Sequence, residues 1–286
     1  MRIGGETRIA GVVGSPVRHS LSPLIHNAWI QAAGLDAVYL AFAPPADGFV
    51  RLVDGLRGGT VLGLNVTLPF KERALACADT ASVAARAAGA ANLLVFGEDG
   101  AVAADNTDGV GLLAALSQAG FRPGDAPVAV LGAGGAARGA VLALLAAGVP
   151  EVRVVNRGLE RAQAIAAAND GVVPFAWADV WEALSGVAAV VNATSLGMTG
   201  QPPLELPLDA APAAAVVMDM VYKPLETGLL AMARAAGHPA ADGLAMLIGQ
   251  AEPSFTAMFG QAPPVSVDVR RLCEESLGEM GAGGRR

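Results

Sequence analysis

The chain has 286 residues, of which 53% are hydrophobic, and it carries a formal net charge of −7. This length allows one large domain or two of ordinary size, and the acidic balance argues against general nucleic-acid binding. The longest apolar run, residues 140–149, is too short to span a membrane, and residues 1–6 lack the apolar core of a signal peptide. We therefore expect a soluble cytoplasmic protein with neither a membrane nor a nucleic acid as its partner.

The cysteine and histidine residues do not suggest a metal site. Cys77 and Cys273 share no metal-ligand spacing with each other or with the three histidines. A structural disulfide is not expected in a reducing compartment. We therefore expect no metal ion and no disulfide.

Strand and helix patterns alternate along the first part of the chain. Pro23 suits the first turn of a helix, and Gly97-Glu-Asp-Gly100 between the runs 92–96 and 101–104 is typical of a β-hairpin. The other expected strands are 8–13, 38–43 and 61–66, and the expected helices are 23–33, 49–56, 70–78 and 82–88.

The second part of the chain alternates in the same way after an expected helix at 107–119. Strands are expected at 128–131, 152–156, 172–176, 189–192 and 215–219, with a short strand and turn at 240–243. Such alternation favours a parallel, doubly wound sheet. We interpret the Pro- and Gly-rich segment 197–212 as a surface loop, and we expect helices at 226–236, 244–259 and 266–277 and a frayed end at 278–286.

A glycine-rich run joins the strand 128–131 to a helix that reaches about Ala147. Its spacing, Gly132-x-Gly134-x-x-Ala137, fits the dinucleotide fingerprint in the form that ends in Gly or Ala. The first glycine makes a tight turn, the second lets the backbone approach a pyrophosphate, and the small third residue lets helix and strand pack closely. The free N–H groups at the start of the helix face the anion.

The end of the next strand bears on the choice of cofactor. In this fold an acidic residue there binds the 2′-hydroxyl of NAD, whereas arginine suits the 2′-phosphate of NADP. The strand ends with Asn156-Arg157, and Arg161 follows one helical turn later. Glu160 between the two arginines weakens the case for NADP, because its negative charge would repel a phosphate. On balance the pattern predicts NADP.

Polar residues that can bind hydroxyl groups gather at the ends of expected strands and in loops. Each has a structural explanation as a cap, a strand residue or a solvated helix residue, and Asp105-Asn-Thr-Asp108 could equally be a helix N-cap. The residues are Ser20, Ser22, Asn65, Thr67, Lys71, Asn92 and Asp108.

A series of short runs extends from about Ile9 to Leu277. The runs are Gly14-Ser-Pro16, His19-Ser20-Leu-Ser22-Pro23, Asn65-Val-Thr67-Leu-Pro-Phe-Lys71, Gly89-Ala-Ala-Asn92, Asp105-Asn106-Thr107-Asp108-Gly109, Gly132-Ala-Gly-Gly-Ala136, Asn192-Ala-Thr-Ser195-Leu-Gly197, Asp219-Met-Val-Tyr222 and Asp242-Gly243 with Gln250-Ala251. In this order and with this spacing they resemble the shikimate dehydrogenase family. Most of them lie outside the dinucleotide fingerprint, so the combination is far more specific than a general Rossmann pattern.

The resemblance implies an α/β enzyme of two domains. Residues 1–108, with 244–286 returning to them, would form the substrate domain, and residues 109–243 would form an inserted Rossmann-like NADP domain. The implied reaction is the reversible NADPH-dependent reduction of 3-dehydroshikimate to shikimate in aromatic amino-acid biosynthesis.

The resemblance also implies roles for individual residues. Lys71 would be catalytic, working with Asp108. The substrate's carboxylate and hydroxyls would be bound by Ser20, Ser22, Asn65, Thr67, Asn92, Asp108, Tyr222 and Gln250. The cofactor site would include Gly132, Ala133, Gly134, Gly135, Ala136, Asn156, Arg157, Arg161, Thr194, Met220 and Gly243. One departure is Gly158, where the family often carries Thr or Ser, and it weakens the NADP prediction slightly.

Two other functions fit parts of the sequence. A quinate/shikimate dehydrogenase paralogue using NAD or NADP would need almost the same pocket, because quinate and shikimate differ by one hydroxyl and ring saturation. A non-catalytic NADP-binding sensor would need the glycine loop but neither Lys71 nor Asp108. The sequence leaves the oligomeric state open, and a homodimer is compatible with it.

Overall fold

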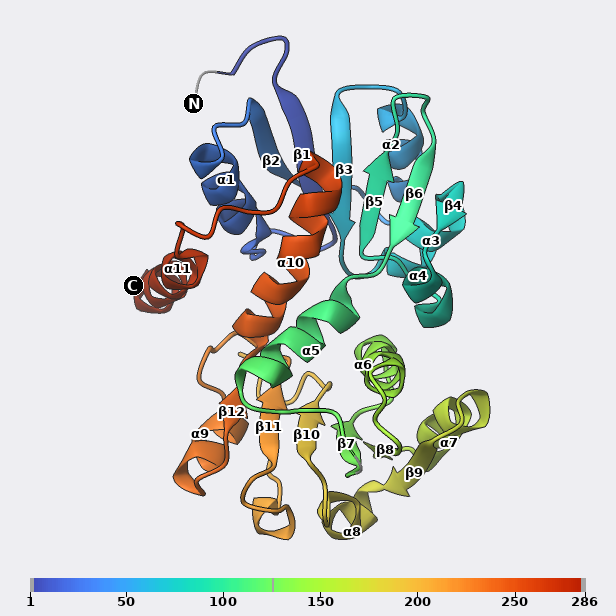
Figure 1. Ribbon diagram of the computed structural model, residues 1–286, viewed down its shortest axis with the longest axis vertical. Coiled ribbons are helices and arrows are strands. Elements are labelled where there is room, and N and C mark those ends of the chain that lie inside the picture. The colour runs from blue at the N-terminus through green and yellow to red at the C-terminus, as the bar shows by residue number, and fades with distance from the viewer. Residues whose placement is uncertain (1–2, 125, 284–286) are drawn as a thin grey trace. The chain divides into compact units, whose positions relative to one another are not determined.

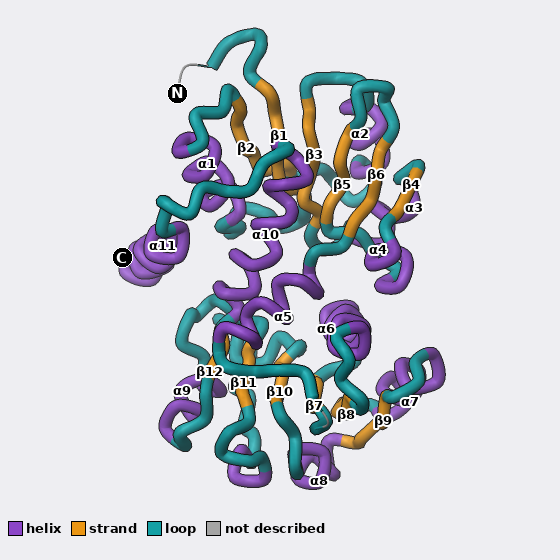
Figure 2. Tube along the Cα trace, viewed as in Figure 1, coloured by secondary structure: helices purple, strands orange, loops and turns teal. Residues whose placement is uncertain are grey.

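The computed structural model describes residues 3–124 and 126–283 of the chain. They divide into two compact units, one within residues 1–107 and 250–286 and the other comprising Asp108–Gly249. The chain therefore passes between the units at Thr107–Asp108 and again at Gly249–Gln250. Each unit contains a six-stranded sheet, and the strands of both sheets are orange in Figure 2. The predicted mixed α/β fold is confirmed.

The first unit is built on a mixed sheet with the strand order β2-β1-β3-β5-β6-β4. Strand β1 is parallel to both β2 and β3, whereas β5 is antiparallel to β3 and β6. The predicted hairpin is therefore present, and β4 adds a short edge that the sequence did not indicate. The strands are β1 (Arg8–Val13), β2 (Ala37–Phe42), β3 (Val61–Val66), β4 (Thr80–Ala81), β5 (Leu93–Phe96) and β6 (Val102–Asp105).

Helices cover both faces of this sheet. Phe49 and Val53 of α2 and Ala74 of α3 join one buried cluster with the sheet. On the other face, α10 crosses in front of β1 and β3 (Figure 1), and a Cβ atom at Gly63 of β3 would lie 2.7 Å from Met258 Cγ of α10. The helices of this unit are α1 (Ser22–Ala32), α2 (Phe49–Leu56), α3 (Lys71–Cys77), α4 (Val83–Ala88), the end of α10 (Gly243–Phe259) and α11 (Val269–Gly283).

The last helix differs from its prediction at both ends. It begins at Val269 because the Asp268 carboxylate accepts a hydrogen bond from Arg271 N at 2.9 Å, which is the geometry of an N-cap. It continues to Gly283, so the expected fraying is wrong for residues 278–283. The expectation for residues 284–286 lies outside the described residues.

The second unit is a parallel sheet with the strand order β12-β11-β10-β7-β8-β9. Every pairing in it is parallel, so the prediction of a parallel, doubly wound sheet is confirmed. The strands are β7 (Val128–Leu131), β8 (Val152–Asn156), β9 (Val172–Ala176), β10 (Ala189–Asn192), β11 (Val216–Asp219) and β12 (Ala240–Ala241).

Alternate residues of these strands face two separate cores. Val128 and Val130 of β7 pack in a cluster with α5, α6 and α7, whereas Ala129 and Leu131 pack with α8 and α9 on the other face. This alternation follows from the two-residue repeat of a strand. The helices are α5 (Asp108–Gln118), α6 (Gly135–Ala146), α7 (Leu159–Ala168), α8 (Val180–Leu184) and α9 (Gly228–Ala235).

The segment 197–212 is not a simple surface loop. Leu204, Leu206 and Leu208 are all buried in the core that contains α8 and α9, and a 3₁₀ turn covers Leu208–Ala210. Because these leucines stand at alternate positions, an extended backbone directs all three toward the same side. The prediction rested on Pro and Gly content and overlooked this repeat.

In the described part of the chain, no helix is both long enough and apolar enough to cross a membrane.

A side chain of α1 occupies the free edge of the first sheet. Strand β2 is an edge strand, and Tyr39 is one of the residues whose backbone polar groups face away from β1. The Asn27 amide donates to Tyr39 O at 2.8 Å and accepts from Tyr39 N at 2.9 Å, and it also donates to Pro23 O at 2.8 Å. Asn27 therefore pairs with β2 in the way that a neighbouring strand would.

Replacing Asn27 with Ala should destabilise the first unit by about 2 kcal/mol, because it leaves the Tyr39 N–H and C=O without their partners. Urea unfolding followed by fluorescence measures this change. Gln31→Ala, an exposed position one turn further along α1, is the matched control and should change stability by less than about 0.5 kcal/mol. Equal effects of the two substitutions would contradict the role assigned to Asn27.

Candidate active site

The loops after β1 and β3 lie side by side in the first unit. Thr67 N donates to Val13 O at 2.9 Å, and Ser15 N donates to Leu68 O at 3.0 Å. Gly14 is required here, because a Cβ atom at this position would overlap the Thr67 side chain. The two loops follow the carboxyl ends of parallel neighbouring strands, which is where α/β proteins commonly bind ligands.

The two predicted serines stand at the start of α1. Ser22 is the first residue of this helix, and its N–H donates to Ser20 Oγ at 3.2 Å. The Ser22 hydroxyl is hydrogen-bonded to the hydroxyl of Tyr39. The serine pair is thus held on one side by the helix and on the other by a buried tyrosine that the sequence analysis did not single out.

Three predicted amides meet in a buried hydrogen-bond cluster. The amide of Asn92 donates to Gln250 Oε1 at 2.9 Å and to Thr107 Oγ1 at 2.9 Å. Asn65 Nδ2 donates to Ser254 Oγ at 2.9 Å and to Asn92 O at 3.3 Å. Asn65 and Asn92 are 6% and 2% exposed, so these bonds satisfy polar groups that have lost contact with water. We call Tyr39, Asn65, Asn92, Thr107, Gln250 and Ser254 the amide cluster.

Tyr39 links the serine pair to the amide cluster. Its hydroxyl donates to Asn65 Oδ1 at 2.8 Å, and burial raises its pKa well above the ordinary value, so the phenol stays protonated at neutral pH. The orientation of Asn65 follows, because its oxygen accepts from Tyr39 and its nitrogen donates to Ser254 and Asn92.

His26 of α1 lies against the ring of Tyr39. The two rings are stacked with their centroids 4.2 Å apart and an interplanar angle of 4°. His26 is 1% exposed, and its Nδ1 atom has no hydrogen-bond partner among the described residues. Burial lowers the pKa of His26 to about 3, so the imidazole is neutral and supports Tyr39 as an aromatic surface and not as a charge.

The two residues predicted to be catalytic belong to different units. Lys71 is the first residue of α3 and is half-buried, and its carbonyl accepts from Ala91 N at 2.9 Å, next to Asn92 of the amide cluster. Asp108 is the first residue of α5 in the second unit and directly follows Thr107.

The glycine loop of the second unit has the geometry expected for binding a pyrophosphate. Gly132 has φ +104°, and a Cβ atom there would lie 3.0 Å from Thr194 Cγ2 and 3.3 Å from Ala193 O. Gly134 is the N-cap of α6, and no heavy atom lies within 4 Å of a Cβ atom placed on it. Ala137 is fully buried against the strand. This open space before a helix N-terminus fits an anion.

The end of β8 carries the predicted nucleotide-specificity residues. Asn156 Nδ2 donates to Gly158 O at 2.8 Å, and Arg157 and Arg161 are both exposed. The Glu160 side chain lies where a side chain on Gly158 would be. A side chain at position 158 would therefore displace the Glu160 carboxylate.

A buried carboxylate joins the loops after β10 and β11. Asp219 accepts hydrogen bonds from Asn192 Nδ2 at 2.9 Å, Val221 N at 3.0 Å and Thr227 Oγ1 at 2.7 Å. Asn192 Oδ1 in turn accepts from Thr194 N at 3.0 Å. Burial raises the pKa of Asp219, and these donors act against that rise.

The remaining predicted cofactor residues lie beside this carboxylate. A Cβ atom on Gly243 would overlap the carbonyl of Met220, so only glycine lets the start of α10 approach the β11 loop this closely. Tyr222, which is predicted to bind the substrate, is half-buried in the same loop and belongs to the second unit.

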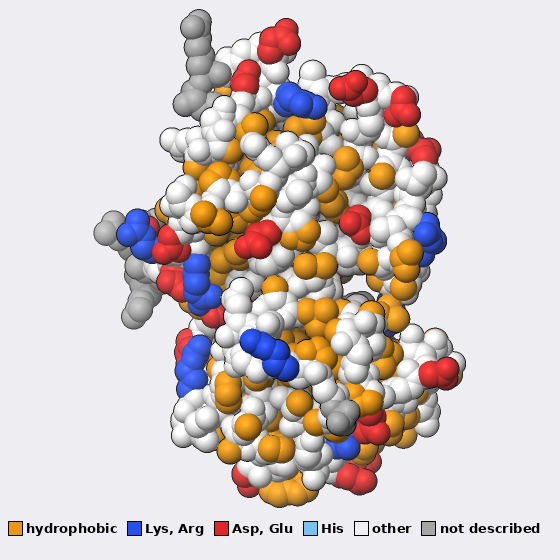
Figure 3. Space-filling view, in the orientation of Figure 1, with side chains coloured by type: hydrophobic (Ala, Val, Ile, Leu, Met, Phe, Trp, Pro, Cys, Tyr) orange, Lys and Arg blue, Asp and Glu red, His pale blue; other side chains and the backbone are white. Residues whose placement is uncertain are grey.

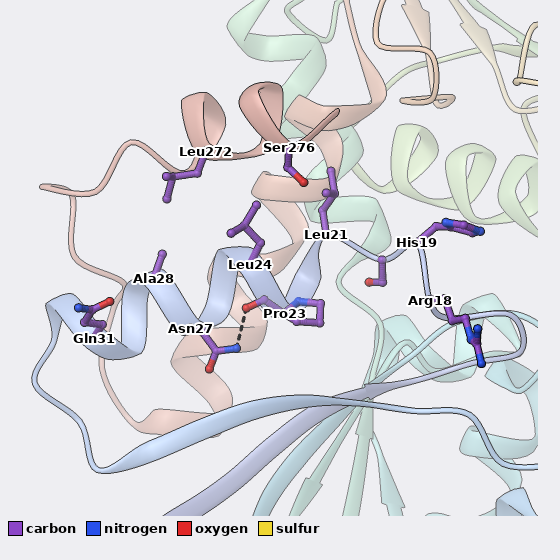
Figure 4. A pocket seen from close by; sticks show the side chains of 11 residues that line it. Arg18, His19, Leu21, Pro23, Leu24, Asn27, Ala28, Gln31, Leu272 and Ser276 are labelled. Carbon is purple, nitrogen blue, oxygen red and sulfur yellow. Dashed lines mark hydrogen bonds between the residues drawn. The ribbon is translucent and has the colours of Figure 1, made fainter. Parts of the chain in front are cut away.

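A hollow of about 660 Å³ lies between α1 and α11 in the first unit (Figure 4). Ser20 lines it, whereas Ser22, Thr67 and Lys71 do not. Arg18 and His19 lie at one end of it and Gln31 lies at the other (Figure 4). The hollow therefore shares only one residue with the predicted substrate site.

Comparison with known proteins identifies the family. Residues 12–94 match the shikimate dehydrogenase substrate binding domain, and residues 115–198 match the shikimate/quinate 5-dehydrogenase domain. A shikimate dehydrogenase (NADP(+)) of Caulobacter vibrioides is 58% identical over 281 residues, which cover 97% of this chain and 99% of the relative. The chain belongs to the shikimate dehydrogenase family.

Two solved structures extend the likeness to the fold. Shikimate 5-dehydrogenase from Thermus thermophilus, in complex with NADP(H) and shikimate, superposes with a TM-score of 0.83 at 35% identity, covering 94% of this chain and 99% of that one. Quinate dehydrogenase from Corynebacterium glutamicum, in complex with NAD, has a TM-score of 0.85 at 30% identity, covering 95% and 99%. The resemblance seen in the sequence motifs is thereby confirmed at the level of the family.

Within this shikimate dehydrogenase family fold, the structure adds residues that the sequence analysis did not assign to the site. Thr107 lies in the motif Asp105–Gly109, in which Asp108 is the predicted site residue. Asn192 and Asp219 likewise lie in family motifs without a predicted role of their own. Tyr39 and Ser254 stand in largely apolar segments, and no local signal in the sequence marks them.

His26 should make the first unit sensitive to mild acid. Its pKa is about 3 when folded and about 6.5 when unfolded, so the unfolded chain binds a proton that the folded chain excludes. The contribution to stability is complete above about pH 6.5 and is lost at up to about 1.4 kcal/mol per pH unit as the pH falls toward 3. His26→Phe should remove this part of the pH dependence in urea unfolding between about pH 7 and pH 5. An unchanged slope would show that His26 does not remain neutral in the folded protein.

Proposed function

We propose that this protein catalyses the reversible NADP-linked reduction of 3-dehydroshikimate to shikimate. The observation that carries the proposal is the convergence of Asn65, Asn92 and Gln250, from three separate segments, in one buried cluster. This cluster belongs to the same unit as Lys71. The full-length similarity to a shikimate dehydrogenase (NADP(+)) supports the same activity.

The polar groups of the first unit suit a small polyhydroxylated acid. Ser20 and Ser22 offer hydroxyl groups to a carboxylate, and Thr67 adds another in the adjacent loop. Amide side chains can donate and accept hydrogen bonds at the same time, so Asn65, Asn92 and Gln250 can bind hydroxyl groups in either role. The packing that fixes these side chains prepares the site before the substrate arrives.

Lys71 is the residue that moves the proton. NADPH, when bound, supplies the hydride to the ring carbonyl carbon. The Lys71 ammonium group donates a proton to the carbonyl oxygen as negative charge develops there, and in the oxidation of shikimate the neutral amine takes it back. Asp108, the first residue of α5, works with Lys71 in the proposal.

The second unit offers the groups that a dinucleotide requires. The glycine loop before α6 binds the pyrophosphate, and Arg157 and Arg161 bind the 2′-phosphate. Thr194, Met220 and Gly243 line the remainder of the site, and Asn192 and Asp219 hold the loops that carry Thr194 and Met220.

For its partners, we propose small molecules in the cytoplasm and no nucleic acid. The Lys and Arg side chains on the face in Figure 3 are scattered among Asp and Glu side chains. A protein that binds nucleic acid typically has its Lys and Arg side chains clustered in a patch or stripe on one face. We include a homodimer among the states compatible with this proposal.

The proposed activity is tested by following the absorbance of reduced cofactor with shikimate or quinate and with NADP or NAD. We expect the highest kcat/KM for shikimate with NADP. A preference for quinate with NAD would favour the paralogue, and tight binding of NADP without turnover of either acid would favour the sensor.

Lys71→Ala should lower kcat by about 10²- to 10⁴-fold with a modest change in KM, because it removes the proton donor. Arg73→Ala, two residues further along α3, is the control and should keep kcat near wild type. A Lys71→Ala enzyme with wild-type kcat would exclude the lysine from the proton transfer.

Thr67→Ala should act mainly on the KM for shikimate, because it removes a binding hydrogen bond.

Arg157→Ala should raise the KM for NADP by about 10- to 100-fold, because it removes a charge-assisted hydrogen bond to the 2′-phosphate. The KM for NAD should change little, so NAD serves as the control within the same variant. Initial rates with each cofactor at saturating shikimate give both values. An equal loss with NAD and NADP would mean that Arg157 does not read the 2′-phosphate.

A further inference from the structure

Ser254 occupies a buried position where three segments of the first unit meet. It is fully buried on α10, and its hydroxyl lies 2.9 Å from Asn65 Nδ2, 3.0 Å from Gln250 O and 3.2 Å from Thr107 Oγ1. A hydroxyl group has one hydrogen to donate and two lone pairs. Ser254 can therefore accept a hydrogen bond from Asn65 and donate one to Gln250 O at the same time.

The bond to Ser254 fixes the amide of Asn65. Asn65 Oδ1 is held by Tyr39 at 2.8 Å, and one N–H points to Ser254 at 2.9 Å. The other N–H makes the longer bond, 3.3 Å, to Asn92 O. That second N–H is the one best able to exchange its partner for a substrate hydroxyl group. Without the Ser254 hydroxyl, the Asn65 nitrogen would keep only the longer bond to Asn92 O.

Ser254 also contacts both places where the chain enters or leaves the first unit. Thr107 precedes one passage and Gln250 follows the other, and Thr107 Oγ1 donates to Gln250 O at 3.0 Å. Pro253 lies inside α10 and has no N–H to donate to the carbonyl of Gly249, one turn earlier. The bond from the Ser254 hydroxyl to Gln250 O lies one residue beyond this gap in the helical hydrogen bonding.

We propose that Ser254 is a positioning residue for the substrate. It does not touch the substrate, and it acts by fixing the amide of Asn65 and the backbone of Gln250. This inference rests on the proposed function, because it assigns the affinity for shikimate in part to a side chain outside the binding groups. Nothing in it concerns the cofactor, whose predicted residues belong to the other unit.

The consequence of this arrangement is a selective loss of substrate affinity in Ser254→Ala. One lost hydrogen bond corresponds to roughly a 5- to 20-fold increase in the Kd for shikimate. The KM for NADP should stay within about twofold of wild type, and kcat should fall by less than about threefold, because Lys71 and Asp108 are unchanged.

The chain provides a matched control on the same helix. Thr256 Oγ1 donates to Glu252 O at 3.0 Å, which is the same bond to the residue four positions earlier, but it is exposed and outside the amide cluster. We would compare wild type, Ser254→Ala and Thr256→Ala by calorimetric titration with shikimate in the absence of NADP, by initial rates and by thermal unfolding. Thr256→Ala should match wild type in shikimate affinity.

A second comparison tests whether Ser254 acts through Asn65. In the Asn65→Ala background the amide is already absent, so Ser254→Ala should change the Kd for shikimate by less than about twofold. Such non-additivity is the signature of two residues that act as a unit. A merely structural serine would reduce affinity by the same factor in both backgrounds.

The outcomes separate this inference from the proposed function. If the wild-type protein neither binds nor oxidises shikimate, the proposed function fails and the inference falls with it. If the wild type is active but Ser254→Ala binds shikimate as tightly, the inference alone is wrong. It is also wrong if Ser254→Ala loses affinity for shikimate and NADP to the same extent.

Discussion

The first unit depends on one physical requirement, that amide groups taken out of water must find partners. Three amides from different segments are joined in this way. Asn65 at the end of β3 donates to the backbone of Asn92 and to the Ser254 hydroxyl, and Asn92 just before β5 donates to Gln250 on α10. An unpaired buried amide costs about 1–3 kcal/mol, so these segments cannot shift independently without breaking bonds. The same bonds hold the donors and acceptors that we assign to the substrate.

The second unit meets a different requirement, the close approach of backbone segments. Gly132 lies against the β10 loop and Gly243 against the β11 loop, at positions where a Cβ atom would collide or crowd. The buried carboxylate of Asp219 then ties the β10 and β11 loops together through Asn192 and Val221. The predicted dinucleotide site therefore combines glycines, which let backbone segments approach closely, with one buried Asp side chain, which joins the loops after β10 and β11.

Much of this architecture follows from local patterns in the sequence. The strands of the second sheet are apolar and short, and the glycine loop has a fixed spacing, so both are predictable without tertiary information. The predictions for the start of α11 and for the segment 197–212 are wrong. The Asp268 cap sets the start of α11, and alternate leucines bury the segment 197–212. Strand β4 has only two residues, Thr80 and Ala81, and so carries no periodic signal.

The candidate site divides in the same way. The residues assigned to the site stand in family motifs and remain predictions, whereas Tyr39 and Ser254, which hydrogen-bond to Asn65, lie outside any local pattern. Ser254 and Asn65 are 189 positions apart in the chain, and only folding reveals that they are neighbours. Tyr39 and His26 look like ordinary core residues, and their importance lies in a stacking contact and a hydroxyl bond that no spacing rule predicts.

The carboxamide of Asn27 on the edge strand β2 bears on assembly. Two copies of a chain can join their sheets by aligning edge strands, and here the central peptide of that edge already has its hydrogen-bonding partners within its own molecule. A dimer built by continuing the sheet would first have to displace that side chain. Continuation of the first sheet across β2 into a second copy is therefore disfavoured at Tyr39, where Asn27 holds both backbone groups.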